Sequence, residues 1–389
     1  MSMKNAVLVS AVRTPVGKRG GVFKTIQRMD LLKPCILEAL KRAGLEGRET
    51  EVDDVLLGNN PEARTPARYG WLASGLPVEV PGLTINRGCG TALTGLTLAG
   101  TFIKGGYGEV YMCGGVEFDS KPVRLVTSSN PYAGGGISIV PRLSSPEQYG
   151  NPNMVTTAEN VAKLLGITRE ECDEYAARSQ ALALKGYEEG LYPEHIVPIT
   201  VPQKKADPIV IDRDEILRPG TTVEILSTLR PVADGVVTGG NASPLNDGAS
   251  AAIMMEEEKA RAMGLKPLMR FVDYATTGVD PRYMGLGPVN AMRKLMKRNG
   301  MTINDFDFIE CNEAFAAQTL GVQRELNIPI EKLNIRGGAI ALGHPYSATG
   351  VNLAAKAAGI FARNDFERCA ITFCCGGGQG VAAIFEKCD

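Results

Sequence analysis

Apolar residues along the chain follow helical and strand spacing in turn, and one order of elements occurs twice. The segment 30–44 has apolar residues at helical spacing, and the apolar run 52–60 that follows it is typical of a strand. The segment 289–300 has the same helical pattern, and the run 306–311 follows it as a second expected strand. The pattern therefore predicts a helix followed by a strand in both parts of the chain.

A second correspondence joins residues 86–120 with residues 334–380. Each segment runs from a glycine-rich turn through a helix of small residues and a short apolar strand to a cluster of glycines. Two copies of a βαβ-type unit predict an α/β protein with two similar halves and mixed, buried sheets, because helical crossovers cover both faces of a sheet.

The segment between the halves is richer in polar residues and proline. It contains two amphipathic helical patterns, which begin at the sequences TTAEN and TREEC. Thr156 or Thr157 with Glu159 predicts one capping box, and Thr168 with Glu171 predicts a second. We interpret this segment as an inserted domain that lies over one half.

These patterns suggest three parts. We expect an N-terminal half at 1–117 plus 245–266, an inserted loop domain at 118–244 and a C-terminal half at 267–389.

Composition excludes several classes of function. The 389 residues include 42 basic and 43 acidic side chains, so no overall field attracts nucleic acid or an anionic membrane. No stretch approaches the roughly 20 apolar residues of a membrane span. The nine cysteines form no regular framework, which favours reduced thiols and a cytoplasmic protein.

Cys89 is the candidate nucleophile. Small residues surround it in NRGCGTAL, and a helix is expected to begin directly after it. A helix N-terminus lowers the pKa of a thiol, and missing side chains let a carbonyl group approach. The alternative is an inert buried cysteine, an interpretation that suits Cys35, Cys113, Cys172, Cys311 and Cys369.

Only two histidines could serve as a general base. His344 lies in a turn between Gly343 and Pro345 with a helix expected after it, which suits proton transfer from a thiol. His195 precedes an expected strand in the polar insert, and we interpret it as a surface or structural residue.

Two further positions carry candidate chemistry. Cys374 ends an apolar strand before three glycines, whose N–H groups can bind an anion, although a tight turn is the alternative. Cys375 should point to the opposite face of that strand. Asn312 and Glu313 follow another apolar strand, at the end where α/β sites usually form; helix capping by Asn312 is the alternative.

Metal and nucleotide sites are not indicated. No Cys or His pair has the spacing of a zinc site, and no phosphate-binding glycine motif stands in usable context.

Four motifs occur in an order that resembles the thiolase family: NRGCG, NEAFA, GGAIALGHP and CCGGGQG. The resemblance extends over essentially the whole chain. It implies duplicated βαβαβ halves that form a five-layered α-β-α-β-α core with an inserted loop domain. It also implies coenzyme A and acyl-CoA as substrates, no cofactor, and a homodimer or homotetramer.

The resemblance assigns roles to five catalytic positions. Cys89 would carry the acyl group after His344 activates it, and Cys374 would be the second acid/base. Asn312, through a bound water, would stabilise an enolate together with His344. The N–H groups of Cys89 and Gly376 would form a second oxyanion hole.

The resemblance also implies contacts with coenzyme A and the acyl group. Ser243 would contact pantetheine and Arg218 the nucleotide, whereas Met154, Met284 and Phe315 would line the reaction pocket.

Three departures affect the expected pocket. Asn153 stands where many acetoacetyl-CoA thiolases carry a histidine, Ala92 replaces a glycine, and the turn PYSATG after His344 has larger residues than usual.

The function implied is reversible condensation and thiolytic cleavage of 3-ketoacyl-CoA, with acetoacetyl-CoA and short chains as substrates. A thiolase of broader or longer-chain range in fatty-acid β-oxidation is the alternative, and a catalytically silent CoA-binding scaffold is a remote one. A ketoacyl synthase is less consistent, because such enzymes pair Cys with His-His or His-Asn, whereas this chain offers Cys374. Two thiols in one pocket also suggest that oxidation could link Cys89 to Cys374.

Overall fold

The computed structural model describes residues 4–58, 64–124, 126–128, 137–140 and 143–388. Five main strands form the sheet of the N-terminal half in the order β4-β3-β5-β10-β1. Strand β3 is parallel to β4 and β5, whereas β10 is antiparallel to β5 and β1. The strands are β1 (Ala6–Arg13), β3 (Asp54–Gly58), β4 (Gly82–Ile85), β5 (Val110–Phe118) and β10 (Asn246–Glu256), and the short β2 (Gly17–Lys18) pairs with β10.

The C-terminal half repeats this topology in the order β12-β13-β14-β11. Strands β12 and β13 are parallel and the other neighbours are antiparallel, as in the series β3-β5-β10-β1. The predicted duplication is therefore confirmed by the strand order. The strands are β11 (Met269–Gly278), β12 (Phe308–Cys311), β13 (Arg368–Cys375) and β14 (Gln379–Glu386).

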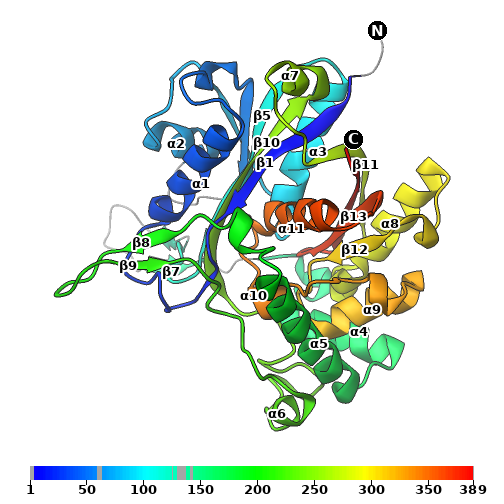
Figure 1. Ribbon diagram of the computed structural model, residues 1–389. Coiled ribbons are helices and arrows are strands. Elements are labelled where there is room, and N and C mark those ends of the chain that lie inside the picture. The colour runs from blue at the N-terminus through cyan, green and yellow to red at the C-terminus, as the bar shows by residue number, and fades with distance from the viewer. Residues whose placement is uncertain (1–3, 59–63, 125, 129–136, 141–142, 389) are drawn as a thin grey trace.

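The helices complete five layers (Figure 1). Helices α1 (Arg28–Arg42) and α2 (Pro66–Ala73) cover the outer face of the N-terminal sheet, and α8 (Gly287–Asn299) and α9 (Ala316–Leu326) cover that of the C-terminal sheet. Helices α3 (Thr91–Lys104) and α11 (Thr349–Arg363) lie between the sheets. Three buried apolar clusters fill these interfaces, so the predicted α-β-α-β-α core is confirmed.

In the central layer the backbones of the two halves approach each other closely. A Cβ atom at Gly350 of α11 would lie 2.0 Å from the backbone nitrogen of Leu93 in α3. Only glycine permits this approach, because any larger residue would collide with the backbone of the other helix. Strands β1 and β11 also pair, at Ala6–Leu8, and thereby join the two sheets.

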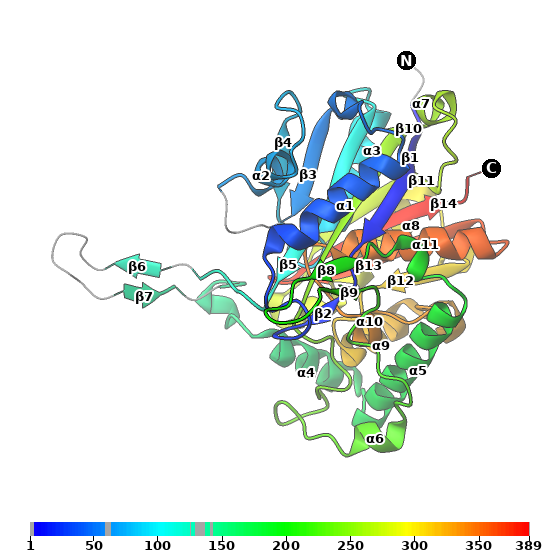
Figure 2. The same ribbon diagram turned by 60° about the vertical axis from the view of Figure 1, so that its left-hand side comes forward.

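The segment 118–244 places its helices over the C-terminal half. Helices α4 (Met154–Leu165) and α5 (Arg169–Glu188) pack against α9, and α5 also contacts α10 (Ala339–Leu342). The hairpin of β6 (Val126–Ser128) and β7 (Ile137–Ile139) reaches away from the body of the molecule (Figure 2). The domain boundaries remain a prediction, and part of this segment lies outside the described residues.

The remaining elements are short. They are β8 (Ile199–Val201) paired with β9 (Ile209–Ile211), α6 (Val223–Ser227), α7 (Glu257–Ala262), and 3-10 helices at Glu49–Glu51, Glu147–Tyr149, Pro193–His195, Pro281–Leu286, Ile303–Asp305 and Ile330–Lys332. Within the described part of the chain, no helix has the length and apolar character needed to cross a membrane.

One predicted helix cap is confirmed and one is wrong. The capping box of Thr168 and Glu171 is present at the start of α5. Helix α4, however, begins at Met154, and its cap is Asn153, whose side-chain oxygen accepts the Thr156 N–H at 2.9 Å. Asparagine is a strong N-cap, so the helix starts before the threonines that the sequence suggested.

Candidate active site

Cys89 lies in the short loop between β4 and α3, directly before the helix cap Gly90. Thr91 holds this loop: its hydroxyl accepts the Arg87 N–H at 2.8 Å and donates to the Gly88 carbonyl at 2.7 Å. The nucleophile candidate therefore has a fixed position at the N-terminus of α3.

The Cys89 loop faces the glycine turn that follows β13. A Cβ atom at Gly90 would lie 2.7 Å from the Cys375 sulfur, and one at Gly88 would lie 3.7 Å from the Gly376 nitrogen. The backbone N–H groups of Gly376 and of Cys89 itself lie close enough to the Cys89 sulfur to act on its pKa, and both lower it. Two backbone donors thus converge at the thiol, as an oxyanion site requires.

The pKa of Cys89 differs from the expectation. Burial raises the pKa of this half-buried thiol to about 12, and the charge of Glu117 acts in the same direction. The N–H groups of Gly376 and Cys89 oppose this rise without overcoming it. The pKa of Cys89 is therefore raised overall and not lowered as expected, so the thiol needs a base to ionise.

His344 supplies a base with a defined tautomer. Its Nδ1 lies 2.8 Å from the Thr349 hydroxyl, and that hydroxyl donates its only proton to the Pro345 carbonyl at 2.8 Å. The hydroxyl must therefore accept the Nδ1–H, which leaves Nε2 unprotonated. Burial lowers the pKa of His344 to about 3, so the ring is neutral and able to take a proton.

Asn312 links His344 to Cys374. Its Nδ2 lies 3.5 Å from His344 Nε2, and its Oδ1 accepts the Cys374 N–H at 3.3 Å and lies 3.6 Å from the Cys374 sulfur. Helix α9 begins only at Ala316 with Phe315 as its cap, so the interpretation of Asn312 as a helix cap is wrong. Its amide is instead available to the site.

The strand register explains why Asn312 and Cys374 lie close together. Strands β12 and β13 are parallel, so their carboxyl ends lie at one edge of the sheet, where Asn312 and Cys374 stand. Burial raises the pKa of Cys374 well above its ordinary value, and nearby cysteines act in the same direction. Cys374 is therefore a protonated thiol, ready to donate.

Cys374 and Cys375 point to opposite faces of β13, as predicted. Cys374 belongs to an apolar cluster with Met284 and Phe315, against which the partly buried Met154 packs. Cys375 belongs to the central core between the sheets. The structure thus brings the three predicted pocket residues together beside one of the two thiols.

The predicted coenzyme A contacts lie in two places. The Ser243 hydroxyl donates to the Ala314 carbonyl at 3.0 Å, next to Phe315. Arg218 is exposed, and its backbone N–H donates to Gln180 Oε1 of α5 at 2.9 Å. Ser243 therefore adjoins the apolar cluster, whereas Arg218 is anchored to α5.

Glu313 and His195 are both buried. The fully buried Glu313 carboxylate accepts hydrogen bonds from Tyr175, Ser179 and Asn334 at 2.7–2.8 Å. His195 is buried, and burial lowers its pKa well below the usual range. The surface alternative for His195 is therefore wrong, and its structural interpretation stays a prediction.

Sequence reasoning missed three residues near the catalytic side chains. Thr349 fixes the His344 ring, the Tyr346 ring contacts it, and Glu117 acts on Cys89. The position of Thr349 and Tyr346 within a few residues of His344 is the one signal that could have identified them.

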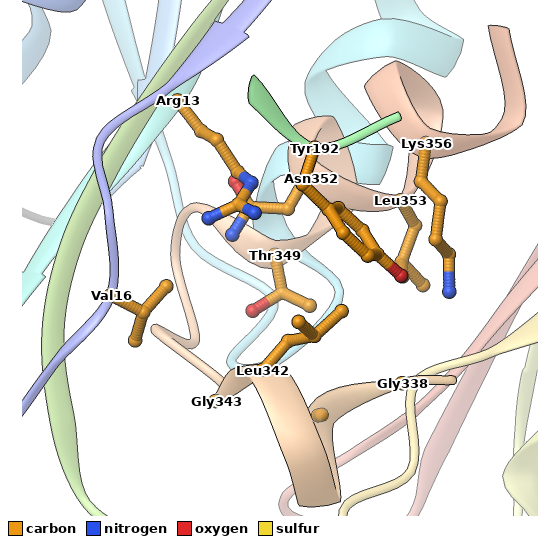
Figure 3. Close-up of a pocket in the computed structure, with 11 residues that line it drawn as sticks. Arg13, Val16, Tyr192, Gly338, Leu342, Gly343, Thr349, Asn352, Leu353 and Lys356 are labelled. Carbon is orange, nitrogen blue, oxygen red and sulfur yellow. The ribbon is translucent and has the colours of Figure 1, made fainter. Parts of the chain in front are cut away.

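A small cavity lies behind the His344 turn (Figure 3). Its volume of about 20 Å³ has room for roughly one water molecule. Arg13 on its wall pairs with Asp214 at 2.6 Å, and Lys356 pairs with Glu310 at 2.5 Å. Its charges are therefore already neutralised, and the cavity is too small for an acyl-CoA. It is lined by Arg13, Tyr192, Thr349, Asn352 and Lys356, among others.

Among the described residues, no group of three or more His, Cys, Asp or Glu side chains could hold a metal ion.

Known proteins resemble this chain over both of its halves. The model of the thiolase N-terminal domain matches residues 6–258, and that of the thiolase C-terminal domain matches residues 265–387. A probable acetyl-CoA acyltransferase of Staphylococcus aureus strain COL is 40% identical over 99% of this chain and 100% of its own length.

Two solved structures share the fold over the full length of both chains. The Bacillus anthracis acetyl-CoA acetyltransferase has a TM-score of 0.92 at 39% identity. The human mitochondrial 3-ketoacyl-CoA thiolase has a TM-score of 0.91 at 37% identity, and its complex with CoA, covered to 99%, has a TM-score of 0.89. With family matches over both halves and these relatives along its whole length, the chain belongs to the thiolase family of acyltransferases.

Proposed function

We propose that the protein catalyses the reversible condensation and thiolytic cleavage of 3-ketoacyl-CoA through an acyl group on Cys89. One observation carries this proposal: His344, Asn312 and Cys374 form a chain of contacts that meets Cys89 across the Gly376 turn. Cys89 supplies a nucleophile and His344 a neutral base. Asn312 supplies an amide donor and Cys374 a second thiol, and the cleavage of a 3-ketoacyl thioester requires all four groups.

Cleavage begins with proton transfer from the Cys89 thiol to His344 Nε2. The thiolate attacks the C3 carbonyl, and the negative charge on its oxygen is stabilised by the N–H groups of Cys89 and Gly376. The C2–C3 bond then breaks, and its electron pair forms the enolate of acetyl-CoA. Asn312 and protonated His344 stabilise the enolate oxygen, and Cys374 donates a proton to C2.

The second half transfers the acyl group to coenzyme A. The Cys374 thiolate takes the proton of the CoA thiol, and the sulfur of CoA attacks the thioester on Cys89. The thiolate of Cys89 leaves and recovers a proton from His344. The first half-reaction replaces the C2–C3 bond with a thioester on Cys89, and the second replaces that thioester with one on CoA. Each step is reversible, so the same residues serve condensation in the reverse direction.

We propose acetoacetyl-CoA and short 3-ketoacyl-CoA as substrates, with a broader or longer-chain range as the alternative. The solved relatives support both, because one is named an acetyl-CoA acetyltransferase and the other a 3-ketoacyl-CoA thiolase. A silent CoA-binding scaffold is less consistent, since Cys89, Asn312, His344 and Cys374 are all present.

The CoA complex of the human relative supports CoA as a substrate here, with the contacts at Ser243, Arg218, Met154, Met284 and Phe315 that the resemblance implies. We also expect a homodimer or homotetramer. Among the described residues no disulfide joins two cysteines, which supports a reducing compartment such as the cytoplasm.

Replacement of the nucleophile tests the proposal. We expect Cys89→Ala to reduce CoA-dependent cleavage of acetoacetyl-CoA by at least about 10³-fold, because the covalent intermediate cannot form. The fall in the ultraviolet absorbance of acetoacetyl-CoA as it is cleaved measures the rate. Circular dichroism checks that the variant is folded. Cys388→Ala, near the C-terminus, is the matched control. Wild-type rates in Cys89→Ala would disprove the mechanism.

A further inference from the structure

The turn after His344 presents one large side chain to the site. The Ala348 N–H donates to the Pro345 carbonyl at 2.8 Å, so Tyr346 and Ser347 are the central residues of a β-turn. Ser347 is buried, whereas Tyr346 is half-buried. The Tyr346 ring meets the His344 ring edge-on, with centroids 5.1 Å apart and an angle of 82°.

Neighbouring strands hold this turn in place. The Ser250 hydroxyl of β10 donates to the Ala348 carbonyl at 2.8 Å. The Ser347 hydroxyl donates to Glu117 at 3.1 Å, and a Cβ atom at Gly115 would lie 2.2 Å from the Ser347 carbonyl oxygen. The backbone beneath Tyr346 therefore has no room to retreat when a substrate enters.

Tyr346 also lies close to the nucleophile. Burial raises the pKa of its hydroxyl above the ordinary range, and the charges of Asp119, Cys89 and Glu117 add to that rise. The ring thus contacts the catalytic histidine and lies within electrostatic range of Cys89 and of two carboxyl groups.

The cleavage reaction separates the substrate into two portions on either side of carbon C3. In a 3-ketoacyl-CoA, carbon C3 joins the acetyl-CoA portion on one side and the rest of the acyl chain on the other. Asn312 and Cys374 handle the acetyl-CoA portion, and the apolar cluster with Met284 and Phe315 lies on that side. The acyl chain on Cys89 must therefore avoid Asn312 and Cys374, and Tyr346 is a large side chain beside His344 that a longer chain would meet.

We propose that Tyr346 ends the acyl-binding space beside Cys89 and restricts the enzyme to short acyl groups. The proposal rests on the proposed function and makes Tyr346 a specificity-determining residue. A rigid ring on a fixed turn rejects longer hydrocarbon chains by collision.

A substrate series tests this inference. The ratio of kcat/KM for 3-ketooctanoyl-CoA to that for acetoacetyl-CoA should be low in the wild type and rise at least about tenfold in Tyr346→Leu. Tyr346→Phe keeps the ring and should keep the low ratio. Tyr107→Leu, at a tyrosine that is 81% exposed on the surface, is the matched control.

The outcomes separate the two proposals. A wild type that cleaves both substrates equally well, or an active Tyr346→Leu variant with an unchanged ratio, would overturn the role of Tyr346 alone. A wild type without activity on any 3-ketoacyl-CoA would instead contradict the proposed function. Because the wild-type substrate series can by itself overturn the role of Tyr346, a variant that fails to fold does not prevent the test.

Discussion

At the scale of single residues, Thr349 determines which nitrogen of His344 can act as a base. Its hydroxyl holds the Nδ1–H and so directs the free Nε2 toward Asn312. We expect Thr349→Val to lower kcat for acetoacetyl-CoA cleavage about 10- to 100-fold, because a buried N–H without a partner costs about 1–3 kcal/mol.

The control is Thr101→Val, which removes a hydroxyl that bonds within α3. Steady-state rates at several pH values should show the loss in kcat with little change in KM. An unchanged kcat in Thr349→Val would contradict the conclusion that the Thr349 hydroxyl fixes the tautomer of His344.

Glu117 makes stability depend on pH. Burial raises the pKa of its carboxyl to about 7, from an ordinary value of 4.5. The folded protein therefore holds a proton that the unfolded chain releases, and this contribution is complete below pH 4.5 and disappears as the pH rises to about 7. Relative to Glu117→Gln, the wild type should lose about 3 kcal/mol of unfolding free energy across that window.

Urea unfolding at pH 5, 6, 7 and 8 measures this difference. Glu188→Gln, at an exposed position of α5, should follow the wild type at every pH. Parallel curves for the wild type and Glu117→Gln would show that the carboxyl is not buried as described.

At the scale of elements, the sequence predicts helices and strands better than their ends. The apolar spacing of 30–44 corresponds to α1, and the patterns at 289–300 and 306–311 correspond to α8 and β12. The start of α4 is misplaced because Asn153 competes with two threonines as cap, and spacing alone does not rank them. For α9 the sequence places the start too early. Asn312 followed by Glu-Ala-Phe-Ala is a good capping sequence, yet the helix begins only at Ala316.

The candidate site shows the same limit. The residue types at positions 89, 312, 344 and 374 indicate chemistry, because their motifs stand at element ends where side chains are exposed to ligands. The raised pKa of Cys89 could not be predicted, because it depends on burial and on Glu117, which is distant in sequence. Tyr346 is visible in the sequence as a larger residue, but its contact with His344 is a matter of tertiary structure.

At the scale of the whole molecule, duplication predicts two similar halves but not how they join. Both halves contribute one helix to the central layer, and each helix starts directly after a catalytic loop, with Cys89 before α3 and the His344 turn before α11. Ala92, the departure expected to reshape the pocket, lies in this helix contact: a Cβ atom at Gly350 would be 2.7 Å from its carbonyl carbon.

Gly350 should therefore control stability and activity together. In Gly350→Ala the new methyl group would meet the backbone of both Ala92 and Leu93, at 2.7 and 2.0 Å, and backbone cannot rotate away as a side chain can. We expect a loss of about 1–3 kcal/mol or more in unfolding free energy.

A shift of about 1 Å between the two catalytic loops should also lower kcat on the order of 10²-fold. Gly239→Ala, where nothing lies within 4 Å of the new methyl group, is the control for thermal unfolding and turnover. Equal stability of the two variants would contradict the backbone contact between the halves.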